Sequence, residues 1–373
     1  MAAKYRADHV GSLLRPPELL AARQAHKEGR ITDEQLREVE DRSVLAALEM
    51  QRQAGVDVLT DGEYRRGVWY GPLSNGIEGF VDDPERASFF QNIRGGRRLW
   101  QGRGSELAEQ TLTEVGEITQ VVGGKLRKVG RMTDGEAAFL KRHAPGPWKT
   151  TMPGIFSRVG MWFKAGLSDQ FYPTRQDLVR ELVGFMQAEV RLLLEEGVSY
   201  FQLDSLTYAM GPASSLLGQN LDEVIAADNA VIEVAKAGGA TVGLHVCRGN
   251  NRSAWASEGS YEPAAERAFT ELKCDRFLLE YDTERAGGFE PLRFMPKDKV
   301  VVLGLISSKE PALEEIDDLR GRIDEAAKYV PFENLAISPQ CGFASTAPGN
   351  LLTWDDQRRK LELVAETARK VWG

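Results

Sequence analysis

The sequence contains few of the residues that bind soft metals or form disulfide bonds, with three cysteines and four histidines among 373 residues. Three cysteines that lie far apart cannot form the disulfide framework of a small secreted domain, so we expect a reducing compartment. No segment approaches the ~20 consecutive apolar residues of a membrane span. The first nine residues also lack the apolar core of a signal peptide. We therefore expect a cytoplasmic protein without a membrane partner.

Blocks of a single charge are also absent. The net charge is −8 and the isoelectric point is about 5.4, while lysines and arginines are scattered along the chain. Proteins that bind nucleic acids usually gather basic residues on one face or along one helix. We therefore expect no nucleic-acid partner.

Short apolar runs alternate with long amphipathic segments, which is the pattern of βα units. Capping boxes that begin at Thr32, Thr174 and Thr353 mark the starts of three helices. The eight predicted strands are Ala7–Leu13, Val56–Asp61, Lys149–Pro153, Tyr200–Asp204, Thr241–Cys247, Arg276–Tyr281, Val300–Ile306 and Leu335–Ser338. The pattern predicts an α/β fold, a (β/α)₈ TIM barrel that forms a single domain over residues 1–373, with an open doubly wound sheet as the competing architecture.

Residues from about 71 to 148 interrupt this alternation, because they contain no clear βα unit. We interpret them as an insertion after the second strand. Within it, Ile118–Val122 and Leu126–Val129 flank Gly123-Gly124, which predicts a hairpin turn. The insertion is either a lid or rim over the mouth of the barrel or an inert surface elaboration.

Three predicted strands end in residues that bind metals, in the segments Leu244–Cys247, Phe277–Glu280 and Ile337–Cys341. Alternate side chains of a strand share a face, so His245 and Cys247 can reach the same ion. Imidazole, thiolate and carboxylate are ligands that zinc accepts. A His-x-Cys pair on a buried strand is also common as core packing, and the spacing is not that of a zinc finger. The third cysteine, Cys274, is interpreted as packing.

The location of these residues favours the metal site. The active site of a (β/α)₈ barrel lies at the carboxyl ends of its strands. The candidate ligands follow strands five, six and eight. Other polar residues end or follow strands two, four and seven, namely Asp61, Glu63, Asp204, Ser307 and Ser308.

Several short motifs resemble those of the cobalamin-independent methionine synthase family, in its C-terminal catalytic barrel. They cover nearly the whole chain in order and are Asp8–Ser12, Thr60–Glu63, Gln202–Asp204, His245–Asn250 and Ser338–Gly342. The resemblance implies a zinc-dependent methyltransferase or alkyltransferase that acts on a thiol, with homocysteine as the usual acceptor in methionine biosynthesis. It places the zinc ligands at His245, Cys247, Glu280 and Cys341. It places the substrate carboxylate at Val10 and Ser12, and the ammonium group at Glu63 and Asp204, and it assigns no side chain a catalytic acid or base role.

The chain also departs from this family. The family's N-terminal half is missing, so the chain corresponds to a short form. Ser307-Ser308 stand where the family commonly has His-Ser, and Ser205-Leu206 follow Asp204 in place of Glu-Pro. These differences leave the methyl donor open between methylfolate and a methylcorrinoid carrier. The true thiol acceptor and the formation of a homo-oligomer also stay open.

A zinc ion at these ligands would serve to activate the thiol. A free thiol has a pKa of about 8.5, so it is mostly protonated at neutral pH, and the thiolate is the nucleophile. Metal coordination removes that proton. Four protein ligands close a tetrahedral site, so we predict that Glu280 lengthens its bond or leaves when the substrate sulfur binds.

Two other functions compete with this one. The same zinc chemistry could open an epoxide with a sulfonate thiol, although Glu63 and Asp204 would then have no ammonium group to pair with. The chain could also be a non-catalytic barrel with a structural zinc, although such sites are usually built from closely spaced Cys and His pairs.

Overall fold

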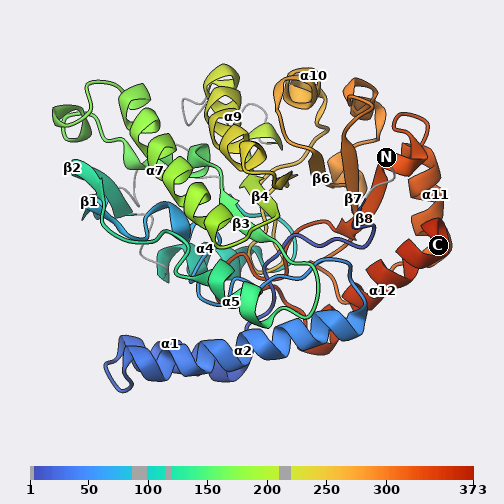
Figure 1. Ribbon diagram of the computed structural model, residues 1–373, viewed down its shortest axis with the longest axis horizontal. Coiled ribbons are helices and arrows are strands. Elements are labelled where there is room, and N and C mark those ends of the chain that lie inside the picture. Colours follow the sequence, from blue (N-terminus) through green and yellow to red (C-terminus); the bar gives the residue numbers. More distant parts are fainter. Residues whose placement is uncertain (1–3, 86–98, 115–118, 210–219) are drawn as a thin grey trace.

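A parallel sheet forms the centre of the computed structural model, which describes residues 4–85, 99–114, 119–209 and 220–373. Its six strands follow one another in chain order, each parallel to the next (Figure 1). They are β3 (Thr150–Pro153), β4 (Tyr200–Ser205), β5 (Thr241–Val246), β6 (Arg276–Glu280), β7 (Val300–Ile306) and β8 (Leu335–Pro339). Nearly every strand residue is buried, as expected when both faces of a parallel sheet are covered. The predicted α/β fold class is confirmed.

The N-terminal segments lie in the gap between β8 and β3. Ala7 forms a parallel bridge with Ile337 of β8, and Leu59 forms a parallel bridge with Trp148, just before β3. The Asp57 backbone N–H donates to Ala7 O at 2.9 Å, which joins the two segments. Backbone hydrogen bonds therefore run from β8 through both segments to β3, in the order that a (β/α)₈ barrel requires.

Neither N-terminal segment is a regular strand, so the predicted strands Ala7–Leu13 and Val56–Asp61 were wrong as extended elements. Side chains take over some of their backbone hydrogen bonds. The Thr60 N–H donates to Gln51 Oε1 at 2.9 Å, and the Gln51 amide donates to Thr60 O at 2.8 Å. Gly11 has a φ of 142°, which is outside the range of a strand. Each segment therefore forms one isolated bridge, Ala7 with Ile337 and Leu59 with Trp148, instead of a regular ladder.

The helices cover the outside of the sheet, with α7, α9 and α10 along one side of Figure 1 and α2 and α12 along another. All three predicted capping boxes are present, at Thr32, Thr174 and Thr353. The helices are α1 (Pro17–Lys27), α2 (Asp33–Ala54), α4 (Ser105–Glu114), α5 (Glu136–His143), α6 (Val159–Trp162), α7 (Arg175–Glu195), α9 (Leu221–Ala237), α10 (Glu262–Glu271), α11 (Ile316–Ala326) and α12 (Trp354–Trp372). None of the helices in the described part of the chain is long and apolar enough to cross a membrane.

The segment predicted as an insertion contains an antiparallel pair of strands, β1 (Ile77–Asp82) and β2 (Gln120–Lys128). The predicted hairpin turn at Gly123-Gly124 was wrong, because β2 continues through both glycines. A side chain at Gly123 would overlap Val81 of β1, so the glycine permits the close approach of the two strands. Of the two predicted hairpin strands, the first begins at residue 118, which lies outside the described residues.

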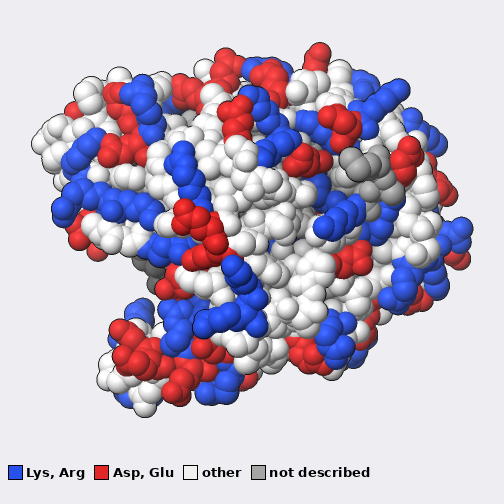
Figure 2. All heavy atoms as spheres, in the orientation of Figure 1, with Lys and Arg blue, Asp and Glu red and all other residues white. Residues whose placement is uncertain are grey.

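Charged residues are mixed over the surface. Figure 2 shows Lys and Arg side chains interspersed with Asp and Glu side chains across this face of the molecule. Many of them form ion pairs between neighbouring helix turns, such as Arg52 with Glu49 at 2.7 Å. Exposed pairs of this kind contribute little stability, so the fold rests on its buried core.

Candidate active site

A pocket lies at the carboxyl ends of the strands, where a (β/α)₈ barrel places its active site. Its enclosed part has a volume of about 50 Å³. Seven of the eight residues that the sequence predicted for zinc and substrate line this pocket, and they are Val10, Ser12, Glu63, Asp204, His245, Cys247 and Cys341. The eighth, Glu280, lies beside it.

Three predicted metal ligands converge. The donor atoms of His245, Cys247 and Cys341 all lie within 4.8 Å of one another, and the two sulfur atoms are 3.7 Å apart. His245 is the fifth residue of β5, and its Nδ1 lies 3.1 Å from Leu278 O. That contact orients the ring, and Nε2 is left buried without a hydrogen-bond partner among the described residues. An oriented imidazole with a free nitrogen beside two thiols fits the donor set of zinc.

The two thiols differ in acidity because they share a hydrogen bond. The pKa of Cys341 is held well below its usual range, first by the hydrogen bond with Cys247 and then by contact with His245. The same hydrogen bond, together with burial, raises the pKa of Cys247. The pair therefore tends to release one proton easily and to retain the other until a cation replaces it.

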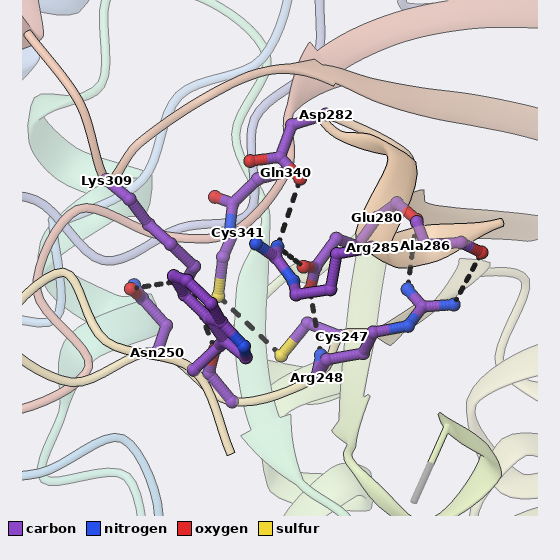
Figure 3. A network of polar contacts seen from close by, with 12 residues as sticks. Cys247, Arg248, Asn250, Glu280, Asp282, Arg285, Ala286, Lys309, Gln340 and Cys341 are labelled. Atoms are coloured by element: carbon purple, nitrogen blue, oxygen red, sulfur yellow. Dashed lines mark hydrogen bonds and ion pairs between the residues drawn. The ribbon is translucent and has the colours of Figure 1, made fainter. Parts of the chain in front are cut away.

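Glu280 ends β6 and is held by neighbouring donors (Figure 3). Its Oε2 accepts the Arg248 backbone N–H at 2.7 Å, and its Oε1 forms an ion pair with Arg285. Burial opposes its ionisation, but the charges of Lys309, Arg285 and Arg248 outweigh burial and lower its pKa. Its carboxylate is not among the three grouped donors, so its role as a fourth ligand stays a prediction.

Two buried carboxyl groups also line the pocket, those of Glu63 and Asp204. Glu63 Oε1 accepts a hydrogen bond from Thr151 Oγ1 at 2.9 Å and lies 3.6 Å from Arg66 Nη1. Its other oxygen, Oε2, is buried without a partner among the described residues. Burial raises the pKa of Glu63, and it raises the pKa of Asp204 to about 7. A cationic group that entered the pocket would relieve the cost of burying both carboxylates.

Ser12 lies against the loop that carries Cys341. The Phe343 N–H donates to Ser12 O at 2.8 Å. A side chain at Gly342 would overlap Ser12 Oγ, so only glycine permits this approach. The predicted binding position for the substrate carboxylate is thereby tied to one of the sulfur-bearing loops.

Ser307 and Ser308 do not line the pocket, although they follow β7. Ser308 Oγ lies 3.0 Å from Gly342 O, to which it donates, and the Ser307 N–H donates to Glu314 Oε1 at 2.8 Å. Both residues therefore serve to fix loops.

Sequence reasoning assigned no role to Lys309 and Asn250, which join the loops around the site. Lys309 Nζ donates to Gly249 O at 3.1 Å and to Asn250 Oδ1 at 2.9 Å. Asn250 Nδ2 in turn donates to Gly342 O at 2.6 Å. The loops after β5, β7 and β8 are thus tied together, as Figure 3 shows in part. The position of Asn250 in the His245–Asn250 motif was the one available signal.

Two tryptophans form part of the pocket wall. Trp69 follows the second predicted strand, and Trp100 belongs to the insertion. Trp100 is buried among Ala108, Ala254 and neighbouring apolar residues. The segment predicted as an insertion therefore contributes at least one side chain to the pocket.

A buried histidine and the third cysteine lie outside the pocket. His9 is buried, its Nε2 lies 3.1 Å from Val58 O, and burial lowers its pKa to about 4. Cys274 is buried in the main core and lies outside the pocket, in agreement with its interpretation as a packing residue.

The chain is similar in sequence and structure to proteins of one family. Residues 169–370 match the catalytic domain of the cobalamin-independent synthases. The uncharacterized protein YxjH of Bacillus subtilis is 35% identical over 99% of this chain and 95% of its own length. A methionine synthase of Saccharolobus islandicus is 26% identical over 89% of this chain and 86% of its own length. The crystal structure of a putative vitamin-B12 independent methionine synthase from Listeria monocytogenes has 26% identity and a TM-score of 0.73, and the match covers 100% of this chain and 99% of that one.

Proposed function

Because the chain belongs to the cobalamin-independent methionine synthase family, we propose that it is a zinc-dependent methyltransferase that transfers a methyl group to the thiol of homocysteine. The observation that carries this proposal is the meeting of two groups of side chains in one pocket. His245, Cys247 and Cys341 form one group, and the carboxyl groups of Glu63 and Asp204 form the other. Soft metal ligands suit a sulfur atom, and buried carboxylates suit an ammonium group.

The ligands of the metal would be His245 Nε2 and the sulfur atoms of Cys247 and Cys341, with Glu280 as the fourth. The orphaned Nε2 of His245 supports this assignment, because a buried polar atom without a partner is unfavourable unless a ligand occupies its free direction. Zinc bound there would hold the substrate sulfur as a thiolate, the form that attacks a methyl carbon.

The Glu280 carboxylate has partners of its own that would remain if it did not bind a metal. The Arg248 N–H and the Arg285 guanidinium together hold its carboxylate away from the grouped donors. A carboxylate that left the metal would therefore not become an unpaired buried charge, which would be strongly destabilising. This supports the predicted exchange of Glu280 for the substrate sulfur.

The amino-acid end of homocysteine would be held at two points. Glu63 Oε2 and the Asp204 carboxyl group would accept hydrogen bonds from the ammonium group. The hydroxyl and backbone N–H of Ser12 would donate to the carboxylate, beside Val10. Such a two-ended hold places the sulfur in a fixed position relative to the incoming methyl group, which can supply a large share of the rate enhancement.

The test is an assay of purified protein whose zinc content has been measured. We expect about one zinc per chain and methionine formation from homocysteine with one of three donors, namely methylfolate, methylcorrinoid or a small methylated compound. Cys341→Ala should lose both zinc and activity. The matched control is Cys274→Ala, which removes a buried thiol outside the pocket and should retain both.

A panel of thiols distinguishes this proposal from its competitor. Methyl transfer should require the α-amino group of the acceptor, because that group would supply the partner that the buried Glu63 Oε2 lacks among the described residues. If 2-sulfanylethanesulfonate reacts with an epoxide while homocysteine is not methylated by any donor, the proposed function is wrong. Absence of stoichiometric zinc from folded, freshly purified protein would also overturn it.

A further inference from the structure

Gln202 connects the two predicted ends of the substrate site. It lies on β4, two residues before Asp204, and is fully buried. Its Nε2 donates to Val10 O at 2.6 Å and to Asp204 Oδ1 at 2.7 Å. Its Oε1 accepts from Lys149 Nζ at 2.6 Å. Both N–H donors of the amide are therefore used, one toward the carboxylate end of the site and one toward the ammonium end.

Lys149 determines which way the Gln202 amide points. An ammonium group has three donors and no acceptor. Lys149 Nζ uses them on Asp8 Oδ1 at 2.7 Å, on His9 O and on Gln202 Oε1. A flipped amide would present its NH₂ group to the ammonium and its oxygen to Val10 O, which would lose three hydrogen bonds. Lys149 thus keeps Gln202 in the orientation that donates to Asp204.

Lys149 is itself fixed in position. It is fully buried, and its partner Asp8 also accepts a hydrogen bond from Tyr200 OH at 2.8 Å. Arg276 Nη2 lies 3.4 Å from Asp8 Oδ2, the oxygen that accepts from Tyr200. The lysine therefore belongs to a closed polar cluster inside the barrel, and its position is defined without any contribution from substrate.

We propose that Gln202, oriented by Lys149, is a positioning residue that sets the relation between the Val10–Ser12 turn and the Asp204 carboxylate, and thereby makes the site selective for thiols that carry an α-amino acid group. This inference rests on the proposed function, because it concerns the same substrate. It goes further by assigning the selectivity to two residues that do not touch the substrate.

A purely structural role would have a different signature. Loss of a buried hydrogen-bond network would weaken the binding of every ligand of the pocket alike, through lower stability or disorder. Loss of positioning should affect most strongly the ligand that uses both ends of the site, because Gln202 joins them. Homocysteine and 4-sulfanylbutanoate are a suitable pair, because they differ only in the α-amino group.

The experiment measures the affinity of zinc-loaded protein for both thiols by calorimetry, together with zinc content and melting temperature. In wild-type protein, homocysteine should bind more tightly than 4-sulfanylbutanoate. In Gln202→Met and Lys149→Met, the affinity for homocysteine should fall about tenfold or more, because a hydrogen bond to a charged group is lost or misdirected. The affinity for 4-sulfanylbutanoate should change by less than about threefold, because a pocket that stays intact keeps its other contacts.

The matched control is Lys299→Met. Lys299 is also a buried lysine, but its Nζ donates to Phe269 O and Leu272 O, below the start of β7 and away from the pocket. Its replacement should leave the ratio of the two affinities unchanged. If Gln202→Met fails to fold, Gln202→Asn keeps an amide on a side chain that is one methylene shorter, so it cannot donate to both Val10 O and Asp204 Oδ1 and should show the same selective loss.

Equal weakening of both thiols in the Gln202 and Lys149 variants would overturn the positioning role while leaving the proposed function intact. Unchanged affinities for both thiols in these variants would do the same. Wild-type protein that binds both thiols equally would overturn both proposals, because no selectivity would exist to be positioned.

Discussion

Glu63 combines two features that are unfavourable in isolation. Its φ is 59°, in the left-handed region that residues with a side chain rarely adopt, and one of its carboxylate oxygens is buried without a partner. The Glu63 N–H donates to Asp61 Oδ1 at 3.0 Å, and Arg15 Nη2 donates to Glu63 O at 3.0 Å, so neighbours hold the strained backbone in place. Strain of this kind persists where the surroundings enforce it, and it is concentrated at functional sites.

The site residues that could be predicted from the sequence belong to residue types that are rare in this chain. His245, Cys247 and Cys341 were found because the chain has few histidines and cysteines, and these ended predicted strands. Gln202 and Lys149 were not assigned a role, because glutamine and lysine are common and unremarkable by type. Their significance depends on a contact with the Val10 carbonyl, 192 positions away from Gln202, which no local pattern contains.

Asp228 on α9 should make stability depend on pH. It is buried, its Oδ2 accepts from Tyr208 OH at 2.7 Å, and burial raises its pKa to about 7 from the model-compound value of 3.8. A raised pKa means that the stabilising contribution is complete below pH 3.8 and is lost as pH rises through 7. Asp228→Asn cannot ionise, so it should be more stable than wild-type protein near pH 8, by up to about 4 kcal/mol, and no more stable near pH 4.

Urea unfolding between these pH values tests this prediction. Asp222→Asn, on the exposed face of the same helix, is the control and should follow the wild-type curve within about 0.5 kcal/mol. Parallel pH curves for Asp228→Asn and wild-type protein would contradict the raised pKa of Asp228 in the folded state.

Among the elements, those with a local signal were predicted and those that depend on distant pairing were not. The three capping boxes were visible as short motifs and are all present. The pairing of β1 with β2 was missed, because Gly123-Gly124 is typical of a turn when only its neighbours are considered. The reason for the first of these glycines, Gly123, lies on another strand, in the side chain of Val81. The two N-terminal segments failed as strands for a related reason, since part of their backbone bonds to side chains outside the strand pattern, as the Thr60 N–H does to Gln51 Oε1.

The capping box of α12 should contribute measurably to stability. The Asp356 N–H donates to Thr353 Oγ1 at 3.1 Å, and the Thr353 N–H donates to Asp356 Oδ2 at 2.9 Å. Thr353→Ala removes one of these bonds, so the free energy of unfolding should fall by about 1 kcal/mol. Denaturant titration measures the change, with Thr353→Ser as the control because serine retains the oxygen. A loss as large in Thr353→Ser as in Thr353→Ala would show that the methyl group, rather than the cap, is important.

At the scale of the whole molecule, the site exists only because the carboxyl ends of distant parallel strands lie together on one side of the sheet. Cys247 and Cys341 are 94 positions apart, and they meet because β5 and β8 end on the same rim. The sequence predicted this rim from the order of strands, and the structure places the polar residues there. The contacts between the loops at the strand ends could not be predicted from the sequence. The hydrogen bonds of Lys309 and Asn250 form only when the three loops after β5, β7 and β8 are assembled.

The same architecture predicts how the protein responds to loss of metal. The strands that carry the proposed ligands are packed without help from those ligands, since residues such as Leu244, Leu279 and Ile337 are fully buried in the main core. Chelation should therefore abolish activity while the far-UV circular dichroism spectrum and a single cooperative melting transition remain. The melting temperature should fall only to the extent that metal binding stabilises the folded state by mass action. Cys341→Ala, which lacks a ligand, should show no shift on addition of the chelator. A structural zinc would behave differently, because the folding free energy would then come from the metal itself and its removal would unfold the chain.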